Sequence, residues 1–163
     1  MTVTTRIWAH GFGVRLRATG LEAPLPDGIE QALRDGIERG FEGERPTFAS
    51  DARGYEVHPD GLDEAVGLLA IRPNVPIEGA ATIEAVAIAP AHRGHAFAMR
   101  ALLAAERQLA REGVERRFAV VPRTNGRGLY FMLRCGFAPM QHPPAHDLEG
   151  CTWFARVVEP LPA

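Results

Sequence analysis

Apolar residues alternate with polar ones in some stretches of the chain and form short continuous runs in others. The alternation V-R-L-R-A within residues 5–18 predicts a half-buried strand. Two apolar runs flank the turn-rich segment 59–63, which is typical of a hairpin. The strands predicted after the first are residues 54–58, 65–71, 83–88, 118–121, 137–140 and 151–158.

Three other stretches have the spacing of helices. A helix is expected to start near Asp27 and to carry one apolar stripe of Ile29, Leu33, Ile37 and Phe41. A second follows the strand at 83–88, with Ala98, Leu102, Ala105 and Leu109 on one face. A third spans residues 125–134. This order predicts a mixed α/β fold, in which helices cover a single sheet of six to seven strands.

Length and composition limit the class of protein. With 163 residues and 46% hydrophobic residues, the chain is expected to form one domain over 1–163. It has no apolar run of about eighteen residues that could span a membrane, and residues 1–17 lack a signal-peptide pattern. Its two cysteines are too few for a disulfide scaffold. We therefore expect a cytoplasmic protein with no membrane partner.

The charge is distributed unevenly. The net charge of −2 argues against nucleic acid as a partner. Residues 91–134, however, contain nine arginines and only three glutamates. Residues 1–90 carry 8 arginines against 14 acids. This pattern suits a small polyanion near the centre of the chain and mildly favours a cationic molecule elsewhere, although each arginine could equally be a solvated surface residue.

The junction between the strand at 83–88 and the following helix predicts an anion site. The strand ends at Pro90, an Arg93–Gly94 loop follows, and the next helix opens with small or apolar side chains. Free backbone N–H groups and the positive end of the helix dipole then meet at one place. Such a site suits a pyrophosphate.

Two segments resemble the GNAT superfamily of acetyl-CoA-dependent N-acetyltransferases. The first, V-A-I-A-P-A-H-R-G-H-A-F-A at 86–98, resembles that family's fourth strand and its pyrophosphate loop, Arg/Gln-x-x-Gly-x-Gly/Ala. The second, N-G-R-G-L-Y-F-M-L-R-C-G-F at 125–137, resembles its Asn-x-x-Ala-x-x-Leu-Tyr-x-x-x-Gly-Phe segment. The resemblance implies a GNAT-like, mostly antiparallel sheet flanked by helices.

The resemblance also implies roles for residues. Acetyl-CoA would be the cofactor, and the acceptor would be an amine of a small molecule or peptide, entering beside the first helix and the 141–150 loop. A gap between the strands ending at Ile88 and Val121 would admit the thioester. Glu84 would act as base, or else be an exposed or ion-paired strand carboxylate. The cofactor-binding residues would be Val86, Ala87, Ile88, Arg93, Gly94, His95, Ala96, Phe97, Ala98 and Asn125.

Two positions depart from the family pattern. Ala96 stands where glycine is usual. Its methyl group would crowd a pyrophosphate only if the residue needed a positive φ or a close contact, and it would be tolerated in a right-handed helical turn, so we expect binding to survive. Met132 stands where the family commonly has a tyrosine as general acid. Tyr130 lies about 200° away around a helix, so it is expected to be an ordinary core or surface aromatic. Met132 keeps a rival function open, a non-catalytic CoA- or acyl-CoA-binding regulatory module.

The remaining histidines and cysteines do not indicate a metal site or a nucleophile. His142, His146 and Asp147 share a loop without convincing metal-ligand spacing, so no metal is expected. Cys135 is expected to pack as a small hydrophobic residue. A third alternative is a GNAT-like fold that serves mainly as a partner in an oligomer, and a homodimer is an open expectation because dimers are common among similar proteins.

Overall fold

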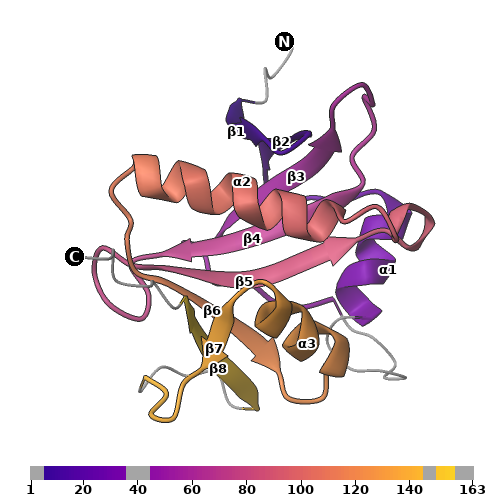
Figure 1. The fold of residues 1–163 in the computed structure, drawn as a ribbon. Helices are drawn as coiled ribbons and strands as arrows, with labels where there is room; N and C mark the ends of the chain where they lie inside the picture. The colour runs from indigo at the N-terminus through magenta and orange to yellow at the C-terminus, as the bar shows by residue number, and fades with distance from the viewer. Residues whose placement is uncertain (1–5, 36–44, 145–149, 157–163) are drawn as a thin grey trace.

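The computed structural model describes residues 6–35, 45–144 and 150–156. Three helices cover a single sheet of eight strands within these ranges (Figure 1). The strands are β1 Ile7–Gly11, β2 Val14–Thr19, β3 Arg53–Pro59, β4 Gly67–Pro73, β5 Ala81–Ile88, β6 Arg117–Pro122, β7 Phe137–Pro139 and β8 Cys151–Arg156. The helices are α1 Asp27–Asp35, α2 Phe97–Arg111 and α3 Gly126–Arg134, with a short 3₁₀ turn at Pro90–His92.

The sheet has the order β1-β2-β3-β4-β5-β6-β8-β7 and is antiparallel except where β5 meets β6. The predicted mixed, mostly antiparallel sheet is confirmed, with more strands than the six to seven expected. The predicted hairpin is also confirmed, because β3 and β4 pair antiparallel across the 59–63 turn segment.

The extra strand arises because one predicted strand is a hairpin. Phe12 and Gly13 turn the chain between β1 and β2, with φ angles of 54° and 76°. Positive φ at both central residues is the geometry of a two-residue hairpin turn, in which Asn or Gly is usual and phenylalanine is rare. Arg107 lies over the Phe12 ring at 4.9 Å and holds this exposed aromatic against α2. Phenylalanine at the first central position is not a turn signal, so the sequence pattern does not predict this turn.

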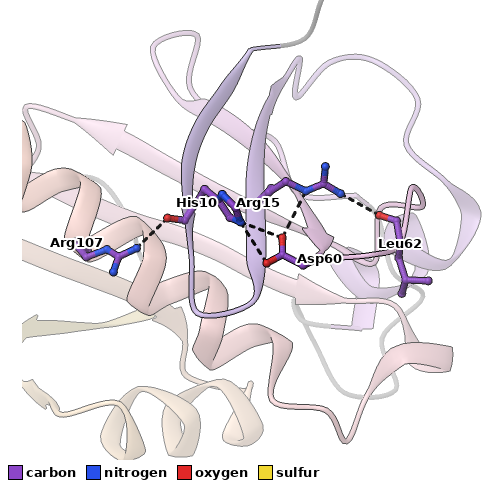
Figure 2. A network of polar contacts seen from close by, with 5 residues as sticks. All are labelled: His10, Arg15, Asp60, Leu62 and Arg107. Carbon is purple, nitrogen blue, oxygen red and sulfur yellow. Dashed lines mark hydrogen bonds and ion pairs between the residues drawn. The ribbon is translucent and has the colours of Figure 1, made fainter.

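Polar contacts connect this hairpin to its neighbours (Figure 2). Asp60, which follows β3, lies 3.1 Å from His10 Nε2 and 3.6 Å from Arg15 Nε. Arg15 also donates to the carbonyl of Leu62 at 3.2 Å. From the other side, Arg107 of α2 donates to the carbonyl of His10 at 2.8 Å. These exposed contacts each contribute little to stability, and together they position the sheet edge.

The central strand β4 is buried on both faces of the sheet. In β4, Leu69 and Ile71 face the core beneath α2, while Leu68 and Ala70 face the core beneath α1. This explains why β4 is a continuous apolar run and does not alternate. The predicted apolar stripe of the first helix is observed for Ile29 and Leu33, while Ile37 and Phe41 lie outside the described residues.

A buried ion pair fastens the end of the sheet to α2. Arg156 of β8 binds both carboxylate oxygens of Glu106 and also donates to the carbonyl of Cys135. The Glu106 side chain is only 8% exposed and that of Arg156 18%. The hydrogen bond to Glu106 raises the pKa of Arg156. Cys135 is half-buried against the main core, as expected of a small hydrophobic residue.

Candidate active site

The central strands β5 and β6 separate along their length, which opens the sheet. They pair in parallel over Ala81, Thr82 and Ile83 of β5 and then diverge (Figure 1). Beyond Ile83, no residue in the described part of β6 pairs with β5, so backbone groups on that side of β5 are free to bind another molecule. The gap predicted between these two strands is present.

A register shift in β5 lies beside this opening. Ala70 of β4 pairs with Ala85, and Ile71 pairs with Ile83, which leaves Glu84 as the extra residue of a bulge. Bulges bend a strand and redirect its side chains, and they are over-represented next to active sites. Glu84 is half-buried on a wall of the cavity that the diverging strands create.

Burial and the neighbouring charges shift the pKa of Glu84. Burial raises the pKa of the Glu84 carboxyl, Asp51 raises it further, and Arg72 lowers it. Arg72 and Asp51 pair with one another at 2.9 Å, which limits the net field that either applies. A carboxylate with a raised pKa binds a proton more readily at neutral pH than an ordinary glutamate does.

Two adjoining cavities occupy the opening. The larger has a volume of about 530 Å³ and lies between the start of α2 and one face of α3. The smaller, about 120 Å³, contains Glu84 and is otherwise largely apolar, with walls from Phe48, Val121 and Phe131. Val86, Ala87, Asn125 and Gly128 belong to both cavities, so an elongated molecule could extend from one into the other.

The start of α2 has uncapped backbone amides. The N–H of Arg100 bonds to the Ala96 carbonyl at 3.0 Å, which leaves the amides of the preceding turn without helical partners. No side chain caps this end. Gly94, with φ of 92°, shapes the loop before it, and both Gly94 and Ala96 line the larger cavity. The uncapped amides and the helix dipole therefore favour an anion here.

The backbone of Ala96 has the positive φ that the sequence left open as one of two alternatives. It has φ of 59° and ψ of 26°, so it lies in the left-handed region and not in a right-handed helical turn. This conformation is strained for any residue with a Cβ, which explains why glycine is usual at this place in the pattern. The Ala96 side chain is exposed, so its methyl group meets no crowded core.

Arg93 connects the loop before α2 to β5 and α1. Its Nε donates to the carbonyl of Ile88 at 3.3 Å, and its guanidinium lies 3.8 Å from the Asp35 carboxylate of α1. These contacts hold the loop against the end of β5. Among the predicted cofactor-binding residues, those that line the larger cavity are Val86, Ala87, Ile88, Arg93, Gly94, Ala96, Ala98 and Asn125. His95 and Phe97 instead pack against one another, with ring centroids 5.5 Å apart.

Asn125 begins α3. Its Oδ1 accepts a hydrogen bond from the Gly128 N–H at 3.0 Å, which caps the helix and leaves the side-chain amide hydrogens available. A Cβ at Gly128 would lie 2.6 Å from Asn125 Nδ2 and 2.8 Å from Val121 Cγ1. Glycine is therefore needed here for α3 to approach β6 this closely.

Met132 and Tyr130 have opposite environments, as their angular separation predicts. Met132 is 4% exposed and belongs to the main core, with one side on the smaller cavity. Tyr130 is 62% exposed and lines the larger cavity. The position that Met132 occupies therefore holds no proton donor, and Tyr130 does not replace one from its own position.

A model of the Acetyltransferase (GNAT) family matches residues 26–137. The chain belongs to the GNAT acetyltransferase family. Its strands β1 and β2 precede the matched region and extend the same sheet.

Solved structures agree on the GNAT fold. A GCN5-related N-acetyltransferase from Brucella melitensis has a TM-score of 0.67 at 18% identity, over 93% of this chain and 78% of that one. An acetyltransferase from Thermus thermophilus has a TM-score of 0.59 at 22% identity, over 89% of this chain and 97% of that one. A GNAT family acetyltransferase from Elizabethkingia anophelis with acetyl-CoA bound has a TM-score of 0.61 at 10% identity, over 91% of this chain and 100% of that one. No curated protein sequence matches the chain.

Several residues that line the two cavities were not among the predicted site residues. They are Asp35 at the end of α1, Phe48, and Arg127, Tyr130 and Arg134 on α3. The three on α3 have spacing that places them on one helical face beside Asn125, so their position could have been inferred. No group of three potential metal ligands occurs within the described residues, and His146 and Asp147 lie outside them. No helix of the described part is long and apolar enough to cross a membrane.

Proposed function

We propose that this GNAT family member transfers the acetyl group of acetyl-CoA to an amine of a small molecule or peptide by direct attack. The observation that carries the proposal is the opening between β5 and β6, which holds an uncapped helix N-terminus at one end and Glu84 at the other. A polyanionic cofactor and an amine could therefore approach one another from opposite ends.

The residues present fit acetyl-CoA. The amides at the start of α2 suit the pyrophosphate, and the unpaired edge of β5 around Val86 and Ala87 suits the amide groups of the pantetheine arm. The side-chain amide of Asn125 is free to donate to the same arm from α3. The largely apolar smaller cavity suits the acetyl end.

Glu84 is the proposed base. Acetyl-CoA supplies a thioester carbonyl, to which the amine nitrogen bonds while the carbon–sulfur bond breaks. Glu84 accepts the proton that the amine loses, directly or through a water molecule, and its raised pKa suits this role near neutral pH. Backbone N–H groups of the β5 bulge could stabilise the developing charge on the oxygen. Because a thiol with a pKa near 8.5 is a tolerable leaving group, the methionine at position 132 slows the reaction without preventing it.

The acceptor would enter near α1. Ala32 and Leu33 of α1 line the cavity that contains Glu84, together with Pro46 and Phe48. A protonated amine would be attracted by the Glu84 carboxylate and by the acidic surplus of residues 1–90. We therefore expect a cationic amine as the acceptor.

One observation favours a second function. Met132 is buried where the family commonly has a proton donor, which would suit a CoA-binding regulatory module that does not react. Two experiments separate the functions. Calorimetry with CoA and acetyl-CoA should show binding in both cases, and absence of binding would exclude both. Release of free thiol from acetyl-CoA over a panel of amines should occur only for the enzyme, and Met132→Tyr should accelerate it.

A further inference from the structure

An ion pair between Asp51 and Arg72 lies beyond the smaller cavity, the one that contains Glu84. The Nε of Arg72, on β4, donates to Oδ1 of Asp51 at 2.9 Å. Neither residue lines either of the two cavities. The proposed function therefore gives this ion pair no part in binding the cofactor or in the chemical step.

Both members of the pair lie on the side of the sheet from which the acceptor would enter. Leu68 and Ala70 of β4 face the core beneath α1, and alternation along the strand puts Arg72 on the same face. Phe48 packs against that core and forms a wall of the smaller cavity, and Asp51 follows Phe48 by three residues. An acceptor too long for the smaller cavity would therefore extend toward Asp51 and Arg72.

Strand register sets the distance between Arg72 and Glu84. Arg72 pairs with Thr82, and Glu84 follows Thr82 by two residues on β5. Diagonal neighbours on adjacent strands lie on the order of 7–8 Å apart, which long side chains can span. In agreement with this proximity, Arg72 has a larger effect on the pKa of Glu84 than any other charged group has, and it lowers that pKa. A molecule whose amine lies at Glu84 needs a chain of about four carbons, the length of a lysine stem, to place a charged group at Arg72.

Each member of the pair can bind a further charged group. Only one carboxylate oxygen of Asp51 and only the Nε of Arg72 take part in their contact, and neither residue has another polar partner among the described residues. The Asp51 side chain is 52% exposed and that of Arg72 is 24% exposed. Asp51 can therefore accept a hydrogen bond from an ammonium group, while the two terminal nitrogens of Arg72 donate to a carboxylate. Together the two residues match a zwitterion, such as the head group of a free amino acid.

We propose that the acceptor is a free amino acid whose side chain ends in a primary amine, with its α-carboxylate bound by Arg72 and its α-ammonium group bound by Asp51. The side-chain nitrogen bonds to the carbonyl carbon of the thioester, the carbon–sulfur bond breaks, Glu84 accepts the proton and CoA leaves as the thiolate. The product is an amino acid acetylated on its side-chain nitrogen. This inference rests on the proposed function, whose cationic amine acceptor it narrows to one class.

Four acceptors that present the same primary amine test the two contacts. They are L-lysine, cadaverine, which lacks the carboxylate, ε-aminocaproate, which lacks the α-ammonium group, and n-pentylamine, which lacks both. In a thiol-release assay, kcat/KM for L-lysine should exceed that for cadaverine and that for ε-aminocaproate by about five- to ten-fold each, and n-pentylamine should be the poorest. Mass spectrometry of the lysine product should find the acetyl group on the side-chain nitrogen.

Two variants assign the contacts to their residues. Arg72→Gln should reduce the preference for lysine over cadaverine to within about two-fold, and Asp51→Asn should do the same for the preference over ε-aminocaproate. Both substitutions also change the electrostatic field at Glu84, but that effect is common to the four acceptors and cancels from their ratios. Arg116→Gln and Asp63→Asn replace exposed residues that line neither cavity, and they should preserve the wild-type ratios.

The outcomes separate this inference from the proposed function. Equal kcat/KM for the four acceptors, acetylation of lysine at its α-nitrogen, or wild-type ratios in both Arg72→Gln and Asp51→Asn would each overturn the inference and leave the proposed function intact. Thiol release with other amines but with none of these four would do the same. Absence of thiol release with every amine of a wider panel would overturn the inference and the proposed function together.

Discussion

Replacing Ala96 by glycine is expected to stabilise the protein. Ala96 has φ of 59°, and a left-handed conformation costs a residue with a Cβ about 1–2 kcal/mol. Glycine removes this strain but loses about 0.5–1 kcal/mol through its greater freedom in the unfolded chain. Because the Ala96 side chain is exposed, no packing is lost. The free energy of unfolding should therefore rise by about 0.5–1 kcal/mol, and Tm by about 1–4 °C.

Ala110→Gly is the matched control for this prediction. Ala110 is also exposed and lies within α2, where the backbone is right-handed, so the same substitution should lower stability by about 0.5–1 kcal/mol. Urea unfolding followed by circular dichroism measures both variants. If Ala96→Gly destabilises the protein as much as Ala110→Gly, Ala96 does not have the strained left-handed conformation described above.

Three further predictions concern the base, the buried ion pair and the cap of α3. Glu84→Gln should lower kcat/KM about 10²–10⁴-fold. It should also abolish the increase in activity that occurs as pH rises through the raised pKa of Glu84. The control Glu78→Gln, on an exposed loop, should have neither effect. The raised pKa means that the folded state favours protonated Glu84, and the stability that the protonated form contributes is lost as pH rises through that pKa. Glutamine stays neutral at every pH, so Glu84→Gln should also raise Tm at neutral pH. Arg156→Met leaves the Glu106 carboxylate buried and unpaired and should cost about 3–5 kcal/mol in urea unfolding, and a loss below about 1 kcal/mol would contradict this. Asn125→Ala should cost about 1 kcal/mol of stability, and Asn125→Asp should restore the cap but not the affinity for CoA, since it lacks the amide donors.

The sequence predicts those parts of the fold that depend on local pattern. The sequence pattern placed all three helices and most strands, and the Arg93–Gly94 loop marked the junction where α2 begins uncapped beside the larger cavity. These features follow from residues near one another in the chain. The β1–β2 hairpin escaped prediction because Phe12 adopts a turn conformation that contacts with Arg107 support from α2.

Features that depend on contacts between residues distant in the chain could not be predicted from the sequence. Glu84 is a bulge because Ala70 and Ile71 of β4 pair with the residues on either side of it. A strand whose two faces are both largely covered has no alternating pattern from which this register could be read. The pairing of Glu106 with Arg156 joins residues fifty positions apart. The left-handed conformation of Ala96 was likewise hidden, because alanine is a strong helix former and the following residues are helical.

Release of free CoA thiol from acetyl-CoA by the purified wild-type protein, measured across a panel of primary amines, tests the proposed acetyl transfer most directly. We expect amine-dependent thiol release that is greatest for a cationic acceptor and that falls about 10²–10⁴-fold in Glu84→Gln. Tight binding of acetyl-CoA with no thiol release above the amine-free background would contradict the proposed acetyl transfer and would identify the protein as a CoA-binding module.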